Sequence, residues 1–403
     1  MQLNYLAFAI PLFLFFMLLE YLVARHKRKP YFNFTNSVAN INVGIAERLL
    51  DIFTTGAFYF VYDYVYRHYA IFHFKPGIFH WLVLWLFTDF IWYWYHRLAH
   101  EVNMLWAVHV VHHQSDDFNY TVAARITVFQ AIVRTGFWAV LPVFGFTAPM
   151  IVTMLLIHGL YPFFVHTQLI GKLGFLEYIL VTPSHHRVHH ASNEAYLDKN
   201  YGDVFIIWDK LFGTFCEEQE GEEIVYGLTE PLGSHSFLWQ HFHFLLELLY
   251  TARQTKGLWN KLKVLFAKPE TIAPDARSAL EQKFGLRQNK GPAPEKLNRY
   301  VLWQVAGILM LLFLFILFES QFPLMVQVAA ALLILVTLIN CGAILEQRKW
   351  IFYLEFTRCL LLLLIVLIYL PTISSLLFIV LGSLLAVVYF KELQRYYLQW
   401  VYS

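Results

Sequence analysis

Several apolar runs in this chain are long enough to cross a lipid bilayer. A helix rises about 1.5 Å per residue, so about 20 apolar residues span a hydrocarbon core of roughly 30 Å. With 58% hydrophobic and only 14% charged residues over 403 positions, the chain carries more apolar surface than a soluble domain can bury. We therefore predict an all-α, multi-pass membrane protein. The clearest runs lie at residues 3–23, 301–318, 323–340, 351–369 and 372–390.

Charge and cysteine content exclude some classes of function. The formal net charge is +2, which favours neither nucleic acid nor an acidic partner. The cysteines, Cys216, Cys341 and Cys359, are far apart and form no CxxC pair. The sequence therefore predicts neither a disulfide framework nor a thiolate metal site.

Basic residues indicate how the chain enters the membrane. The cluster at residues 25–29 follows the first apolar run, whereas a signal peptide carries its basic residues before the run. The positive-inside rule then places the end of an uncleaved first span in the cytoplasm. A hairpin of spans at about 42–62 and 78–95 would return the chain to that face at residue 96. A second hairpin over 125–170, broken at LPVFGFTAP, would bring His166 to the same face.

The rest of the chain divides by composition. We predict a catalytic membrane domain over 1–300, with a cytoplasmic cap at about 191–267 and a linker at about 268–300. Residues 301–403 form a C-terminal transmembrane bundle without histidine, to which we assign a structural role such as packing or homo-oligomerisation. The expected location is a bacterial inner membrane or the endoplasmic reticulum, with the active site facing the cytoplasm.

Histidines are concentrated in one part of the chain. Of 18 histidines, 11 fall between residues 96 and 190, and most of these are spaced three or four residues apart. Residues at this spacing share one face of a helix, so each cluster directs its imidazoles to one place. The candidate metal ligands are His96, His100, His109, His112, His113, His166, His185, His186, His189 and His190.

Energetics favour metal over an ordinary buried role for these clusters. An unsatisfied buried polar group costs roughly 1 to 3 kcal/mol, so about ten of them would exceed the stability of a typical domain. Neutral imidazoles suit transition metals, and because one ion seldom takes more than six ligands, two ions are implied. No HExxH sequence of the zinc proteases is present. We interpret nitrogen-only ligation as favouring a pair of iron ions that activate oxygen.

Other polar residues have two interpretations each. Asp89 lies two helical turns before His96, so it is either a functional carboxylate or a buried one bonded to a neighbouring span. His158, His68 and His80 are expected to be ordinary core or interface residues, and Glu20 to lie at the membrane interface.

The three histidine boxes resemble a known superfamily. HRLAH, HVVHH and HHRVHH are similar to the boxes of the membrane di-iron fatty acid hydroxylases and sterol desaturases, and the segments NYGDVFIIWDKLFGTF and VYGLTEPL look like the alkylglycerol monooxygenase branch. This resemblance implies two Fe ions, O2 and, in that branch, a reduced pterin (tetrahydrobiopterin) as electron donor. It makes metal ligands of the box histidines other than His185, and of His166, which would come from a separate helix. His185 stays open, because many relatives have another residue just before the last box.

The resemblance also suggests roles for residues near the boxes. Glu101 matches a glutamate linked to pterin use, although it could instead pair with Arg97 at i, i+4. Asp116, Asp117 and Asn119 are close enough to the second box to hold ligand imidazoles, or they form a turn and a helix cap. Asn200, Asp203 and Asp209 are similar candidates, whereas Trp208, Phe212 and Gly213 are expected to pack beneath the site.

The leading functional hypothesis is an O2-dependent hydroxylase of a membrane lipid. Hydroxylation next to an ether oxygen would yield a fatty aldehyde and a glycerol derivative, with electrons from a pterin or a redox protein. The first alternative is a sterol or fatty acyl hydroxylase or desaturase of the same superfamily. The second, from another class, is a membrane metal carrier or haem-binding protein.

Overall fold

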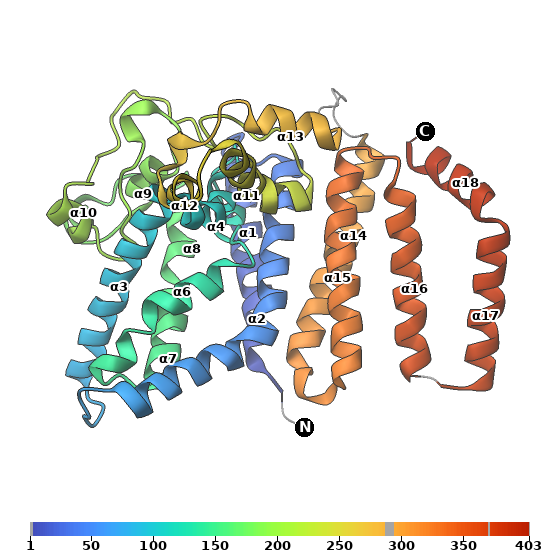
Figure 1. The fold of residues 1–403 in the computed structure, drawn as a ribbon, viewed down its shortest axis with the longest axis horizontal. Helices are drawn as coiled ribbons and strands as arrows, with labels where there is room; N and C mark the ends of the chain where they lie inside the picture. The colour runs from blue at the N-terminus through green and yellow to red at the C-terminus, as the bar shows by residue number, and fades with distance from the viewer. Residues whose placement is uncertain (1–2, 287–293, 370, 403) are drawn as a thin grey trace. The chain divides into compact units, whose positions relative to one another are not determined.

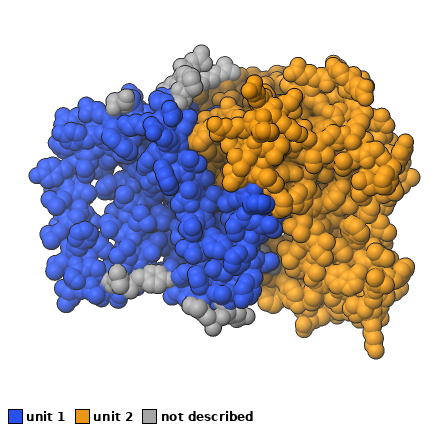
Figure 2. All heavy atoms as spheres, turned by 180° about the vertical axis from the view of Figure 1, so that it is seen from behind, with its two compact units in different colours: residues 1–15, 234–239, 288–403 blue, residues 16–233, 240–287 orange. Residues whose placement is uncertain are grey.

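The protein is helical wherever its structure is described. The computed structural model describes residues 3–286, 294–369 and 371–402, in which the only β-pairing consists of two isolated bridges, Leu180 with Phe205 and Ala191 with Tyr226. The chain forms two compact units (Figure 2). Unit 2 comprises residues 16–233 and 240–287, and unit 1 comprises residues 1–15, 234–239 and 288–403. The prediction of an all-α membrane protein is confirmed.

The helices are labelled in chain order (Figure 1). Up to residue 286 they are η1 (Tyr5–Phe8), α1 (Ala9–His26), α2 (Phe34–Tyr69), α3 (Ile78–Glu101), α4 (Asn103–His113), α5 (Tyr120–Ala123), α6 (Gln130–Trp138), η2 (Leu141–Phe144), α7 (Ala148–His158), α8 (Tyr161–Val165), η3 (Gly174–Tyr178), α9 (Pro183–His189), η4 (Glu194–Tyr196), α10 (Ile207–Phe212), α11 (Phe237–Gln254), α12 (Leu258–Phe266), η5 (Pro269–Thr271) and α13 (Ala276–Phe284). After residue 294 they are α14 (Glu295–Leu317), η6 (Glu319–Gln321), α15 (Leu324–Leu345), α16 (Ile351–Tyr369), α17 (Ile373–Val388) and α18 (Phe390–Tyr402).

Among the described residues, five segments are long and apolar enough to cross a membrane. A sixth crossing is added if α17 and α18, which meet at 79°, count as one broken span. The protein is thus a multi-pass membrane protein. The five segments are Tyr5–His26, Ala148–Val165, Glu295–Leu317, Leu324–Leu345 and Ile351–Ile368.

The hairpin expected at 42–62 and 78–95 forms as two helices, but neither α2 nor α3 is among these candidate spans. α2 is longer than expected, at 36 residues, and carries charged residues in its first half. There Arg48 donates from Nε to Glu47 at 2.6 Å and lies 3.1 Å from Asp51. α3 carries Asp89 near its middle and ends in the polar sequence HRLAHE. The two helices are therefore long enough to cross a membrane but less apolar than the sequence analysis assumed.

A cluster of buried apolar residues supports the lower part of α3. Tyr62, Leu84, Leu141 and Ile151 pack together from α2, α3, η2 and α7. A single non-helical residue, Val102, separates α3 from α4. The two helices that carry the first and second histidine boxes therefore follow each other directly. The core thus holds the upper end of α3, where the histidines begin, on a rigid base.

The segment expected as a linker, 268–300, is partly helical. It contains η5 and α13, and α13 is held because Ala276 and Leu280 are buried and Arg277 donates to Glu247 at 2.8 Å. Residues 276–284, within the segment expected as a linker, are thus helical and packed through contacts that are not visible in composition. Residues 287–293 lie outside the described part of the chain.

Unit 1 contains the C-terminal helices α14 to α18. Its charged residues are few, and one group is buried among the helices: Glu355 accepts hydrogen bonds from Tyr300 (2.7 Å), Asn340 (2.7 Å) and Tyr397 (3.1 Å), and it pairs with Arg358. Every described contact of this carboxylate is made within the bundle. The group joins four helices, which suits the structural role predicted for this part of the chain.

Candidate metal centre

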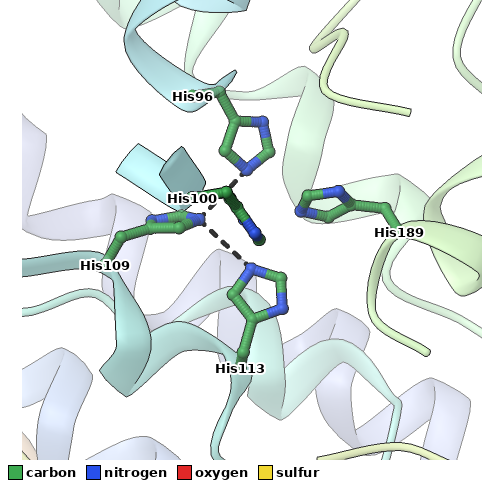
Figure 3. A group of neighbouring side chains, drawn as sticks. All are labelled: His96, His100, His109, His113 and His189. Carbon is green, nitrogen blue, oxygen red and sulfur yellow. Dashed lines mark hydrogen bonds between the residues drawn. The ribbon is translucent and has the colours of Figure 1, made fainter. Parts of the chain in front are cut away.

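Five of the candidate histidines form one group. His96 and His100 come from α3, His109 and His113 from α4, and His189 from α9 (Figure 3). One ring nitrogen from each lies within 4.8 Å of the corresponding nitrogens of the others. The Nε2 atom of His109 is 3.0 Å from that of His96 and 3.2 Å from that of His113. We call this the five-histidine group.

Four further histidines form a second group. The Nε2 atom of His166 lies 3.2 Å from that of His112 and 2.9 Å from that of His186, and His190 completes the set. All four side chains are buried. We call this the four-histidine group.

Helix geometry explains why neighbouring histidines serve different groups. Consecutive residues on an α-helix point about 100° apart, whereas residues four apart point the same way. His113 therefore joins His109 in the five-histidine group, while His112 faces the four-histidine group. The same offset separates His189 from His190. The second and third boxes thus each supply ligands to both centres, whereas His96 and His100 of the first box both belong to the five-histidine group.

Backbone carbonyl groups orient several of the rings. In each case Nδ1–H donates to a main-chain oxygen, which leaves Nε2 unprotonated and directed toward the group. This is the arrangement that metal-binding imidazoles need. The pairs are His96 with Tyr201 (2.8 Å), His189 with Lys199 (3.0 Å), His112 with Arg125 (3.2 Å) and His166 with Pro162 (2.6 Å).

The loop that supplies two of these carbonyls has a specific conformation. Asp209 accepts hydrogen bonds from the N–H groups of Tyr201 (2.7 Å) and Gly202 (2.8 Å). Asn200 has a φ of +56° and donates to the carbonyl oxygens of His185 and Cys216. Asn200 and Asp209 were predicted to hydrogen-bond the ligand rings. They bind the backbone that holds these rings instead.

The rings are held in the neutral form. Burial, followed by the neighbouring imidazoles, lowers the pKa of His113, His186 and His190 well below the usual value. Burial also lowers the pKa of His189 to about 4. Among the described residues, the buried Nε2 atoms of His189 and His190 have no hydrogen-bond partner. Neutral imidazoles with unpartnered inward nitrogens fit a transition metal in each group.

A third buried cluster lies apart from both groups. The His158 ring is placed between two carboxylates, with Nε2 2.9 Å from Asp89 and Nδ1 2.9 Å from Asp203. Asp89 also accepts hydrogen bonds from the N–H groups of Val204 (2.9 Å) and Phe205 (3.1 Å) and from the indole of Trp208 (2.8 Å). We call Asp89, His158 and Asp203 the carboxylate clamp. Of the two interpretations offered for Asp89, the structure agrees with the second: it is a buried carboxylate bonded to neighbouring segments.

The carboxylate clamp fastens the ligand-orienting loop to α3 and α7. Both ring nitrogens of His158 face acceptors, so both can donate only when the imidazole is protonated and offsets one of the two negative charges. Because the clamped residues 203–205 directly follow Lys199 to Gly202, the clamp fixes the carbonyls that orient His96 and His189. His158 was expected to be an ordinary buried residue. The clamp was not foreseen because its charged partners lie far from it in sequence.

Several other candidates lie near the groups without facing them. Glu101 pairs with Arg97 at 3.0 Å and its side chain is 33% exposed. Asn119 caps α5 by accepting from the N–H of Thr121 and also donates to the carbonyl of Tyr31. Nothing in the described geometry brings either side chain to a ligand ring.

The remaining candidates are likewise outside the two groups. Asp117 accepts from the backbone of Asn33 and the side chain of Asn36, and the carboxylate of Asp116 lies beside Gly227. His185 uses Nδ1 to accept the N–H of Thr182, in the capping box at the start of α9. The structure therefore gathers nine of the ten candidate histidines and leaves His185 aside.

Glu20, expected at the membrane interface, is buried inside the protein. It is 3% exposed, accepts from the N–H of Tyr120 at 2.7 Å and pairs with the hydroxyl of Thr167 at 2.5 Å. Thr167 directly follows His166. The glutamate therefore fastens α1 to the segment that carries a ligand of the four-histidine group.

Arg125 is a site residue that sequence reasoning missed. Its guanidinium is buried and donates to the carbonyl of Val111 (2.5 Å) and to the side chains of Asn40 (2.9 Å) and Gln114 (2.6 Å). Its own carbonyl orients His112. The available signal was a lone arginine within the stretch TVAARITVF, twelve residues after the end of the second box.

Comparison with known proteins places these groups in a family. The profile of the fatty acid hydroxylase family matches residues 81–214, which include all nine gathered histidines. Human alkylglycerol monooxygenase is 36% identical over 375 residues, covering 90% of this chain and 82% of the relative. The chain belongs to the alkylglycerol monooxygenase family. The Xenopus tropicalis member is 32% identical over 368 residues, covering 89% and 81%.

More distant comparisons are consistent with this membership. The ornithine lipid hydroxylase OlsE of Rhizobium tropici is 28% identical over 144 residues, which cover 35% of this chain and 43% of that protein. No solved structure matches the chain. As a member of the alkylglycerol monooxygenase family, the protein is an oxidoreductase, a lipid monooxygenase that uses O2, and the family together with the histidine groups indicates iron as its metal.

Proposed function

We propose that this enzyme cleaves the ether bond of alkylglycerols by means of two iron ions, one in each histidine group. The observation that carries the proposal is the pair of adjacent groups of neutral, buried imidazoles in the part of the chain that matches the family. The five-histidine group would hold one ion and the four-histidine group the other. Iron, when bound, supplies the reductive activation of O2.

The overall reaction balances with a two-electron donor. One atom of O2 enters the C–H bond next to the ether oxygen, and the other leaves as water with two electrons and two protons. The resulting hemiacetal loses its hydroxyl proton and transfers it to the departing glycerol oxygen. The products are a fatty aldehyde and a glycerol derivative.

The residues of this chain position the ligands and exclude water. All nine gathered histidines except His100 are buried, and the side chain of His100 is only 9% exposed. The clamp and the 199–202 loop hold the rings of His96 and His189 in place before metal arrives. Preorganised ligands avoid the cost of reorganisation at each turnover.

We propose that the site faces the cytoplasm of a bacterial inner membrane or of the endoplasmic reticulum. Glu20 near the end of α1 contacts Thr167, so this end of the first span lies close to the four-histidine group. The basic residues 25–29 follow immediately. By the positive-inside rule, that end is cytoplasmic.

We propose a reduced pterin, tetrahydrobiopterin, as the electron donor, with Glu101 near its binding site. Glu101 follows His100 of the five-histidine group directly and keeps part of its carboxylate exposed while paired with Arg97. A carboxylate there can accept hydrogen bonds from the N–H groups of a pterin ring. In Glu101→Gln, the KM for the pterin should rise while bound iron stays constant. A matched Glu220→Gln variant, changed in an exposed loop, should alter neither, and an unchanged pterin KM in Glu101→Gln would refute this role.

The reaction is tested by offering iron-loaded, reduced enzyme an alkylglycerol, a sterol and a fatty acid in parallel under 18O2. The aldehyde is reduced at once to the alcohol so that its oxygen does not exchange with water. Labelled product from the ether lipid alone supports the proposal, and His113→Ala should abolish it. Labelled sterol or fatty acid without aldehyde would instead indicate the alternative hydroxylase, and an unlabelled product with a new double bond would indicate the alternative desaturase.

A further inference from the structure

The segment between α8 and α9 exposes large apolar side chains outside any candidate span. Phe175 and Tyr178 are 75% and 73% exposed, and Leu211 on α10 is 69% exposed. Soluble surfaces rarely gather such residues without a partner. The set, which we call the loop–α10 surface, consists of Ile170, Leu173, Phe175, Tyr178, Ile179, Ile207 and Leu211.

The two parts of this surface are joined to each other. The ammonium group of Lys210 on α10 donates to the carbonyl oxygens of Glu177 and Tyr178, each at 3.1 Å. It also lies over the ring of Phe215, 4.7 Å from the centroid. An isolated bridge pairs Leu180 with Phe205, just before α10. The loop and α10 therefore form one continuous surface.

The position of the surface indicates what covers it. The loop begins a few residues after the candidate span Ala148–Val165 ends. α10 lies beside the upper part of α3, where Phe212 contacts the rings of Tyr93 and Trp94 (Figure 1). Trp and Tyr residues are enriched at the boundary between lipid and water, and α3 has four of them at residues 92–95. The loop–α10 surface is thus at the level where a bilayer ends.

The charges around the surface are complementary to a membrane. Lys172 and Lys210 are exposed at its margin. The partly buried carboxylate of Glu177 accepts hydrogen bonds from the N–H of Leu173 (3.0 Å) and the hydroxyl of Thr182 (3.0 Å), within its own segment. Exposed cations beside apolar side chains suit anionic lipid headgroups over acyl chains.

We propose that the loop–α10 surface is inserted into the boundary between headgroups and acyl chains of the surrounding membrane. This inference rests on the membrane character of the protein and not on its proposed substrate. Because Glu177 is bonded to Thr182, the residue that caps α9, the inserted loop is tied directly to the helix that carries His186, His189 and His190. The bilayer contact thereby supports the metal centre from its membrane side.

The test is the accessibility of spin labels in vesicles that contain a third anionic phosphatidylglycerol. Labels are placed by Phe175→Cys and Leu211→Cys in a chain with Cys216→Ser and Cys359→Ser, which leaves only the buried Cys341. Two controls bracket the result: Leu18→Cys on the lipid-facing side of α1 and Glu220→Cys in an exposed acidic loop.

Labels at Phe175 and Leu211 should be relaxed more strongly by O2, which concentrates in lipid, than by a water-soluble nickel chelate. The label at Leu18 should show the same preference. Relaxation by nickel as at Glu220 would overturn the proposal, because the surface would then face water. Protection from both reagents would also overturn it, since a protein partner would then cover the surface. In Lys172→Gln, which leaves the Lys210 hydrogen bonds intact, the label at Phe175 should become more accessible to nickel, whereas unchanged accessibility would contradict the role given to anionic lipid.

Discussion

The substitution Asp89→Asn tests whether the carboxylate clamp holds the metal centre together. Asp89 is 0% exposed and accepts hydrogen bonds from the ring of His158, from two backbone N–H groups and from an indole. Asparagine has nearly the same size. It lacks the negative charge, however, and one of its two terminal atoms is a donor that would face other donors.

The expected cost follows from what is left unpaired. His158 keeps Asp203 as its charged partner, so the cost comes from the two buried donors that would face the new amide N–H2 group. Each buried donor left without an acceptor costs about 1 to 3 kcal/mol, which gives roughly 2 to 6 kcal/mol in total. For a unit of more than 200 residues, each kcal/mol shifts the melting midpoint by about 2 to 4 °C, so a fall on the order of 10 °C is expected. The loop that carries the carbonyls of Lys199 and Tyr201 should loosen as well, so bound iron should also decrease.

The assay is thermal unfolding of the purified protein in detergent, with iron measured on the same sample. Asp63→Asn is the matched control, because Asp63 pairs with Arg67 on an exposed part of α2 and such pairs contribute about 0 to 1 kcal/mol. A melting midpoint and iron content in Asp89→Asn equal to those of the control would refute the role of the clamp.

Further expectations concern the supports of the site. Gly202→Ala should lower iron content and stability, because an added Cβ would lie 2.7 Å from the carbonyl oxygen of Phe205; Gly136→Ala, with no atom within 4 Å, should be neutral or stabilising by under about 1 kcal/mol. Asn119→Ala should cost about 1 to 2 kcal/mol in thermal unfolding, by loss of a helix cap, without changing bound iron. Glu218→Gln should lower stability by about 2 kcal/mol, since Glu218 accepts two hydrogen bonds from buried Arg187, at 3.0 and 2.6 Å. Burial acts to raise the pKa of Glu218, but hydrogen bonds from Arg187 and Ser184 hold this pKa below its usual value. The stabilisation is therefore present at neutral pH and is lost as the pH falls through the lowered pKa. An acid unfolding curve unchanged in Glu218→Gln would contradict this expectation.

Helical spacing predicted most of the ligand set but not how it divides. His109, His112 and His113 were expected to converge on one place, but only His109 and His113 share the five-histidine group, and His112 belongs to the four-histidine group. The division of His112 from His113 follows from the angle between consecutive residues, but which residues meet them depends on tertiary packing. His166, recognised through the family resemblance, is an example, because it reaches His112 from a different helix.

Backbone supports could not be predicted, because they carry no side-chain signal. The carbonyls of Lys199 and Tyr201 face His189 and His96 only because Asn200 adopts a positive φ and Gly202 fits against Phe205. The carboxylate clamp was missed for a related reason. His158 lies 69 residues from Asp89 in sequence, and no periodicity connects them.

The central claim is that the nine histidines form two separate iron sites. It is tested most directly by 57Fe Mössbauer spectroscopy with iron quantification on the wild type, His189→Ala and His190→Ala, which differ by one position but alter different groups. The wild type should hold about two irons per chain in two distinguishable environments. Each variant should lose or alter a different one, and His185→Ala should retain both. A single iron per chain, or the same environment lost in both variants, would contradict the account.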